Sequence, residues 1–107
     1  MTLDEIRALV VSVDPSAGHY ESAHRPGHSY TTWQEIQRAG LRADNVMPCK
    51  SWNFQIDRYT KREDDPVPGR LEAALDACPA VAYDHQVAYE PDSGYIHHIF
   101  DCEAAGA

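Results

Sequence analysis

The 107-residue chain has few cations and no long apolar run. Nine Lys and Arg stand against 17 Asp and Glu, a formal net charge of -8. Because nucleic-acid binding depends on cations that neutralise phosphates, this balance excludes specific nucleic-acid binding. No window approaches the ~20 apolar residues that span a bilayer, and the amino end lacks the basic start and apolar core of a signal peptide. We therefore expect a cytosolic protein with no membrane partner.

The chain also lacks compact signatures of metal binding and catalysis. Its three cysteines, Cys49, Cys78 and Cys102, are widely spaced and form no CxxC pair, which excludes a disulfide framework and a zinc finger. There is no glycine-rich phosphate loop, no GxSxG elbow, no HExxH helix and no dinucleotide fingerprint. We therefore expect no cofactor, no resident metal and no catalytic residues, and a structural or binding role in place of an enzyme.

The length and the residue composition are those of one globular unit. Apolar residues make up 43% and charged residues 24%, ordinary values for a folded chain. A chain of this size buries roughly two thirds of its unfolded surface. We expect a single domain over residues 1–107.

Two segments have helical patterns. Thr2 and Glu5 have the spacing of a capping box, and a period-3.6 stripe of Leu and other aliphatic residues over 3–13 follows it, ended by Asp14-Pro15. Asp65-Pro66 supplies an N-cap and a first-turn proline, and a second apolar stripe runs from Val67 to Cys78 before Pro79 ends it. The sequence thus predicts two amphipathic helices.

Four segments have strand patterns. Residues 30–36 are rich in β-branched and aromatic side chains, and residues 51–59 alternate strictly between apolar and polar. Residues 81–89 and 95–102 flank the turn 91–94 and predict a β-hairpin. We expect an irregular loop at 16–29, a long connection at 37–50, interrupted by Gly40, Asn45 and Pro48, and a frayed tail at 104–107.

The order of these elements is α-β-β-α-β-β. Strands that come in pairs separated by a helix favour a mostly antiparallel sheet. The sequence therefore predicts an α+β fold with about four strands and both helices on one face of the sheet.

Six histidines are the remaining candidates for chemistry. His97 and His98 are neighbours in a strand, so their side chains point to opposite faces and do not bind one ion together. His98 and Cys102 share a face, and His85 lies in the partner strand, which leaves a site of two histidines and one cysteine as an alternative. Against a reactive thiolate, Asp101 and Glu103 flank Cys102, and their charges raise a thiol's pKa.

The loop histidines and the acidic residues give weaker signals. His19, His24 and His28 match no metal-ligand spacing, and their roles stay open, as do those of His97 and His98. Asp64-Asp65 is explained by helix capping and Asp57 by the polar face of a strand, in place of general acid and base catalysis. Eight aromatic residues exceed what a small core usually holds, which favours oligomerisation: Tyr20, Tyr30, Trp33, Trp52, Tyr59, Tyr83, Tyr89 and Tyr95.

Two segments carry a resemblance to a known class of protein. Residues 51–60, followed by Asp65-Pro66, and residues 87–102 resemble small tail-completion or tail-terminator proteins of tailed bacteriophages and prophages. The resemblance implies a non-enzymatic α+β subunit that forms a homo-oligomeric ring, commonly a hexamer, at the tail end or head-tail junction. It also implies other tail or connector proteins as partners, and a location first in the bacterial cytoplasm and then in the virion tail.

Two other functions remain open from the residues alone. The first is a small metal-binding protein or enzyme that uses His85, His98 and Cys102. The second is a regulatory module that binds another protein through an edge of its sheet.

Overall fold

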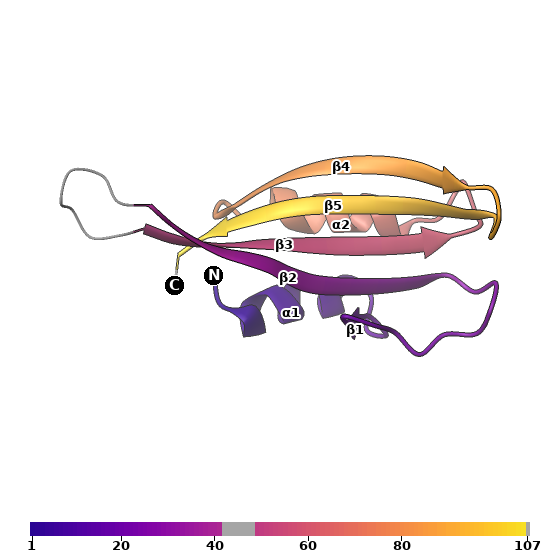
Figure 1. Cartoon of the computed structure of the whole chain (residues 1–107), viewed down its shortest axis with the longest axis horizontal. Coiled ribbons are helices and arrows are strands. Elements are labelled where there is room, and N and C mark those ends of the chain that lie inside the picture. The colour runs from indigo at the N-terminus through magenta and orange to yellow at the C-terminus, as the bar shows by residue number, and fades with distance from the viewer. Residues whose placement is uncertain (42–48, 107) are drawn as a thin grey trace.

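The computed structural model describes residues 1–41 and 49–106 and shows two helices packed on one face of a single sheet (Figure 1). The elements are α1 (Leu3–Val13), β1 (Gly18–His19), β2 (Tyr30–Leu41), β3 (Cys49–Thr60), α2 (Val67–Asp76), β4 (Val81–Glu90) and β5 (Tyr95–Ala105). Within the described ranges the sheet has the order β1-β2-β3-β5-β4. The predicted α+β fold, mostly antiparallel and with its helices on one face, is confirmed. We call the face away from the helices the open face.

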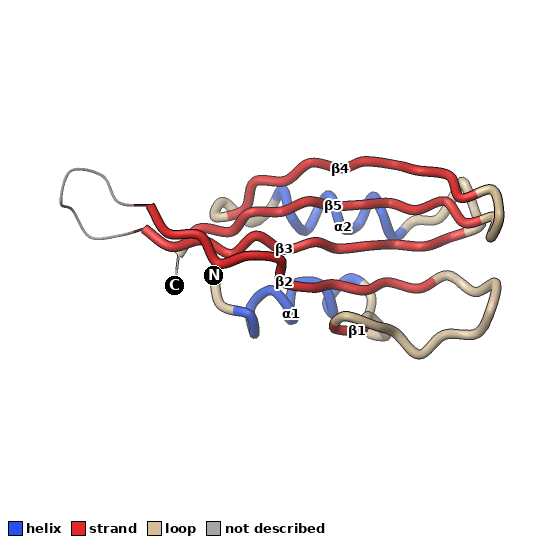
Figure 2. The backbone as a smooth tube through the Cα atoms, in the orientation of Figure 1, coloured by secondary structure: helices blue, strands red, loops and turns tan. Residues whose placement is uncertain are grey.

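The sheet has five strands in place of the four expected. The extra strand is β1, two residues that pair in parallel with Thr32 and Trp33 of β2 and lie beside that strand in Figure 2. The Tyr20 N–H donates to the Trp33 carbonyl at 2.7 Å and secures the end of this pairing. The stretch expected to be wholly irregular at 16–29 therefore contains a short edge strand.

β2 and β3 are longer than predicted. They pair from Tyr30 with Tyr59 to Leu41 with Cys49, so both ends of the expected 37–50 connection belong to the sheet. The centre of that connection, with Asn45 and Pro48, lies outside the described residues. The pairing contains a β-bulge between Glu35 and Gln37, which adds one residue to β2 and shifts its alternation by one position.

The core forms between the helices and the alternate strand residues that face them. Fully or almost fully buried side chains come from both helices and from β2, β3 and β5: Ile6, Val10, Trp33, Phe54, Ile56, Leu71, Leu75, Phe100, Cys102 and Ala104. Each large apolar side chain buried in this way contributes about 1.5–3 kcal/mol relative to exposure. The strict alternation of β3 thus places one set of side chains in the core and leaves the other set on the open face.

Local capping determines where the helices begin. At α1 the Glu5 N–H donates to Thr2 Oγ1 at 3.2 Å and the Thr2 N–H donates to Glu5 Oε1 at 3.1 Å, which confirms the predicted capping box. At α2 the Val67 N–H donates to Asp65 Oδ1 at 3.2 Å. Pro66 precedes the first helical residue, so α2 begins at Val67.

A buried arginine joins the two helix ends to the sheet. Arg58 on β3 donates from Nε to Asp65 Oδ2 at 2.8 Å, and from Nη1 to Asp14 Oδ2 at 3.3 Å and to Thr31 Oγ1 at 3.1 Å. Burial alone would raise the pKa of Asp65, but hydrogen bonds from Arg58 and the Val67 N–H outweigh it and lower that pKa. Asp65 therefore accepts from the first N–H of α2 and pairs with Arg58, whereas the N-cap position predicted for it is held by Pro66.

The expectation of a frayed tail is wrong for residues 104 and 105. β5 continues through Ala105, and Ala104 is fully buried. The amino-terminal ammonium of Met1 donates to the Ala105 carbonyl at 2.8 Å, and the Gly106 N–H donates to the Lys50 carbonyl at 2.9 Å. These bonds hold Met1 and Gly106 against the sheet. Across the described residues no helix is long and apolar enough to cross a bilayer.

Candidate functional site

The adjacent histidines of β5 lie on opposite faces of the sheet, as alternation predicts. On the open face, His97 Nε2 is 2.7 Å from Asp57 Oδ1, and its Nδ1 is 3.4 Å from Glu90 Oε2. On the helix face, His98 Nδ1 is 2.9 Å from His85 Nε2. The two side chains therefore belong to separate clusters and do not share a ligand.

The cluster on the helix face contains His85, His98 and Glu72, and it excludes Cys102. His85 Nδ1 contacts Glu72 of α2, and the His85 ring stacks on Phe100 at 4.2 Å between centroids. Phe100 stands between His98 and Cys102 on this face of β5. Burial, and secondly the neighbouring His85, lower the pKa of His98. The described residues contain no group of three or more His, Cys, Asp or Glu side chains placed to hold a metal ion.

Cys102 has the surroundings of a core residue. Its side chain is 5% exposed, and burial, together with the charge of Asp101, raises the pKa of its thiol to about 12. The acidic flanks identified in the sequence act in the expected direction, but burial has the larger effect. The thiol is therefore protonated near neutral pH, which does not suit a nucleophile.

The three loop histidines are in three different environments. His19 stacks between Tyr20 and Trp33 at 3.9 Å from each ring, and its Nε2 is 3.0 Å from Glu35 Oε2. His24 stacks on Tyr30 at 3.6 Å. The His28 carbonyl accepts a hydrogen bond from a tyrosine of β5. The His19 and His24 rings and the His28 carbonyl thus contact different partners, and the three histidines form no shared site.

A stack of aromatic rings covers one end of the open face. The rings follow the order His24, Tyr30, Tyr59 and His97 with centroid separations of 3.6, 4.6 and 4.1 Å. Tyr95 contacts Tyr30 and Tyr59 edge-on. Burial, and then the nearby Asp57 carboxylate, raise the pKa of Tyr59 to about 12. Much of the aromatic excess noted in the sequence is thus used within the chain.

Tyr95 also fastens the loop to the sheet. Its hydroxyl accepts from the Gly27 N–H at 3.0 Å and donates to the His28 carbonyl at 3.0 Å. Gly27 has a φ of 83°, a left-handed conformation that favours glycine. One side chain of β5 therefore satisfies two backbone groups of the loop.

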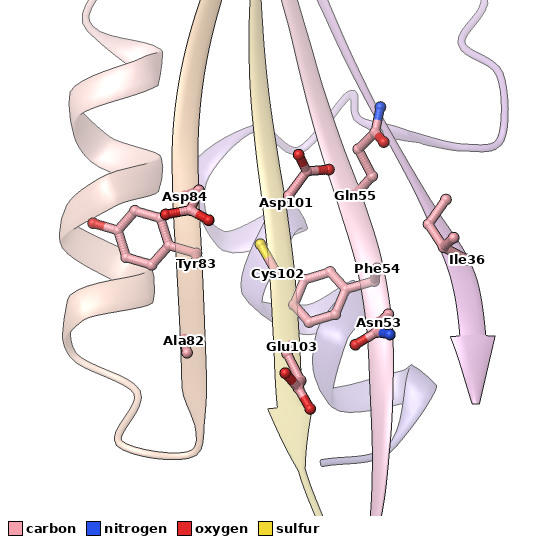
Figure 3. A pocket seen from close by; sticks show the side chains of 10 residues that line it. All are labelled: Ile36, Asn53, Phe54, Gln55, Ala82, Tyr83, Asp84, Asp101, Cys102 and Glu103. Atoms are coloured by element: carbon pink, nitrogen blue, oxygen red, sulfur yellow. The ribbon is translucent and has the colours of Figure 1, made fainter. Parts of the chain in front are cut away.

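The other end of the open face is acidic and hollowed. A groove of about 390 Å³ lies over β2, β3, β5 and β4, as Figure 3 shows. Its lining residues are Ile36, Asn53, Phe54, Gln55, Ala82, Tyr83, Asp84, Asp101, Cys102 and Glu103. We refer to it as the acidic groove, because its three charged side chains are all carboxylates.

The strand register places these carboxylates beside one another. Asp84 lies directly opposite Asp101, and Asp101 in turn lies opposite Gln55 of β3. Asp84, Asp101 and Glu103 are all exposed. Among the described residues none of the three has an ion-pair partner. The groove is therefore a concentration of negative charge, suited to a cationic ligand surface.

Sequence reasoning did not identify the acidic groove as a site. Its side chains come from four strands that are far apart in sequence, and only the register brings them together. One signal was available, because alternation through the predicted hairpin places Asp84 and Asp101 on the same face when the turn at 91–94 is closed. The histidines drew attention because they are adjacent in sequence, which is a poor guide to proximity within a strand.

Comparison with known proteins gives a likeness of fold. No protein-family model matches the chain, and no curated protein matches it with significance. A chain from the virion of a native gene transfer agent (GTA) particle aligns with a TM-score of 0.58 and 11% identity, over 95% of this chain and 88% of that chain. A second solved structure, whose name states no function, aligns with a TM-score of 0.55 and 16% identity, over 100% and 97% of the two chains. At these identities the likeness concerns the fold alone.

Proposed function

We propose that this protein is a non-enzymatic structural component of a phage-like particle. The observation that carries the proposal is the fold likeness to a chain of a gene transfer agent virion, which spans nearly the whole length of both chains. The side chains that were candidates for chemistry, the histidines and Cys102, also support it, because they lie in aromatic stacks, side-chain pairs or the core. His85 contacts Glu72 and His98, and Cys102 is buried in the core.

Within such a particle we propose the position of a tail terminator, a ring at the tail end or the head-tail junction. The sequence resemblance in the β3 and β4–β5 segments favours this position. A ring needs surfaces that face neighbouring copies, and the open face, which neither helix covers, offers one. A homo-oligomer, commonly a hexamer in this class, is the expected assembly.

Particles from the producing cells test this proposal at two levels. Mass spectrometry of purified particles is expected to detect the chain, and gold-labelled antibody is expected to mark a single end of each tail. If the chain is absent from intact particles, the structural role is wrong. If label lies along the tail or on the capsid, the role in the particle stands and the terminator position is wrong.

One observation favours a second candidate, a module that binds a partner protein through a sheet edge. β4 is an edge strand in the described sheet, and its Val87 and Tyr89 side chains are 60% and 65% exposed. An extended segment of a partner adds readily to such an edge. This candidate predicts a monomer with one specific partner, whereas the ring predicts self-association.

A further inference from the structure

We infer that the acidic groove is the docking site for the basic end of the β2–β3 hairpin of a second copy of this chain. We define that basic end by Arg38 and Lys50. The inference rests on the proposed ring, because it names the contact through which neighbouring subunits would meet. Two observations support it: the two surfaces have opposite charges, and they lie on opposite faces of the sheet.

The acidic groove contains charge repulsion that nothing within the described chain relieves. Asp84 and Asp101 form a directly opposed pair on adjacent antiparallel strands, and like charges in that position destabilise a sheet. Glu103 lies two residues further along β5 on the same face. Side-chain arrangements that lower the stability of the folded chain are characteristic of binding sites. Cations placed over the groove would remove the repulsion.

The basic end of the hairpin has the complementary charge. Arg38 lies opposite Trp52 and Lys50 lies opposite Gly40, so the two cations are diagonal neighbours on one face. The Arg38 guanidinium lies 4.5 Å from the centroid of the Trp52 ring, and both cations are exposed. Neither has an ion-pair partner in the described part of the chain. By contrast, Arg7, Arg58 and Arg62 pair with carboxylates of the same chain.

Strand alternation prevents a single copy from joining its own two surfaces. Trp52 has the same parity as the core residue Phe54, so Arg38 and Lys50 lie on the helix face of the hairpin. Asn53 and Gln55 have the opposite parity and line the groove on the open face. Figure 1 shows that this end of β2 and β3 extends beyond both helices, and Arg38 and Lys50 are exposed there. The cations therefore need the groove of another copy.

The resulting contact is directional. It joins two different patches, the helix face of one hairpin and the open face of the next subunit. Such a heterologous contact produces a closed ring when the rotation between subunits closes, and a filament when it does not. Ile36, which lines the groove and is 56% exposed, adds apolar surface to the contact. The chemistry and the symmetry both fit a second copy as the occupant.

The test compares the self-association of the full chain and of charge variants by light scattering and sedimentation across a concentration series. The groove variant is Asp101→Lys with Glu103→Lys, and the hairpin variant is Arg38→Glu with Lys50→Glu. A combined variant carries all four changes. The matched control, Glu63→Lys with Asp92→Lys, changes the net charge by the same amount as the groove variant at two exposed residues elsewhere. Circular dichroism confirms that each variant is folded.

The wild type and the control are expected to assemble at the same concentration. The groove and hairpin variants should each need at least about a tenfold higher concentration, and the combined variant should recover assembly because both charges are reversed. Assembly of the wild type should also weaken as salt rises, since salt screens charges at the surface. If the groove variant does not fold, Asp101→Asn with Glu103→Gln replaces it, with the same expected loss.

Three results would overturn the inference. In the first, the groove and hairpin variants assemble as the wild type does. In the second, both lose assembly and the combined variant does not recover it. In the third, the wild type is monomeric throughout and binds only a basic peptide, which makes the occupant a different protein. The first two leave the proposed function intact, because detection of the chain in particles is measured independently.

Discussion

Asp84 and Asp101 face each other directly across β4 and β5, on the side of the sheet that no helix covers. Neither carboxylate has an ion-pair partner in the described part of the chain. Their repulsion therefore lowers the free energy of unfolding of the isolated subunit. Their arrangement connects the stability of the chain with the role that we propose for its open face.

Replacing one of these carboxylates should stabilise the subunit. Asp101→Asn keeps the size of the side chain and removes the repulsion, so the free energy of unfolding should rise by about 0.2–1 kcal/mol. Urea unfolding at low protein concentration measures the change. Asp92→Asn, in the exposed turn between β4 and β5, is the matched control and should leave stability nearly unchanged. Equal effects in the two variants would contradict the opposed pair as the cause.

Removing the buried arginine should have a much larger effect. Arg58→Met leaves the carboxylates of Asp14 and Asp65 without their cation, and the loss of one partner from a buried ion pair costs about 3–5 kcal/mol. Thermal and urea unfolding measure it. Arg62→Met removes the exposed pair with Asp64, whose side chains are 65% and 82% exposed, and should cost less than about 1 kcal/mol. A small effect at Arg58 would show that the network does not join the helices to the sheet.

His98 should make the fold sensitive to mild acid. Because burial and His85 lower its pKa in the folded state, the unfolded chain binds the proton more readily. The contribution of His98 is therefore fully present above the unfolded pKa near 6.5 and is lost as pH falls through the lower folded value. NMR titration is expected to place the His98 midpoint below 6.5.

Two variants separate this effect from other groups. His98→Gln should reduce the fall in unfolding free energy between pH 7 and the folded midpoint, whereas His28→Gln in the exposed loop should not. His85→Gln should raise the His98 midpoint, since it removes the neighbouring ring that lowers it. A His98 midpoint at or above 6.5 in the wild type would contradict the structure at this pair.

The hydroxyl of Tyr95 should control the order of the loop. Tyr95→Phe removes the hydrogen bonds to the Gly27 N–H and the His28 carbonyl while it retains the ring contacts. We expect a loss of about 1 kcal/mol per bond, confined to the loop, which hydrogen exchange at Gly27 and its neighbours would detect. Tyr89→Phe, at a side chain that is 65% exposed, is the control. Unchanged exchange at Gly27 would show that the hydroxyl is not the anchor.

Local signals predicted most of the fold. The capping box at Thr2 and Glu5, the helix start after Asp65, and the alternation of β3 all act between near neighbours in the chain, so they are readable without tertiary information. β1 was missed because two residues show no period, and its pairing depends on β2. The tail was expected to fray because small residues carry no pattern, although Ala104 packs fully in the core.

The candidate site was less predictable for the same physical reason. Alternation alone separated His97 from His98, and the structure confirms that separation. The acidic groove instead depends on which strands are neighbours and on their register. The position of β5 between β3 and β4 is a property of the whole sheet, and no local pattern in the sequence specifies it.

The β-bulge at Ile36 determines on which face of the sheet Arg38 lies. If Ile36 were paired regularly and β2 alternated without a bulge, Arg38 would lie opposite Ser51 on the open face, beside the carboxylates of its own chain. By shifting the alternation once, the bulge places the basic end of the hairpin and the acidic groove on opposite faces of one sheet. Each copy therefore has one basic and one acidic contact surface.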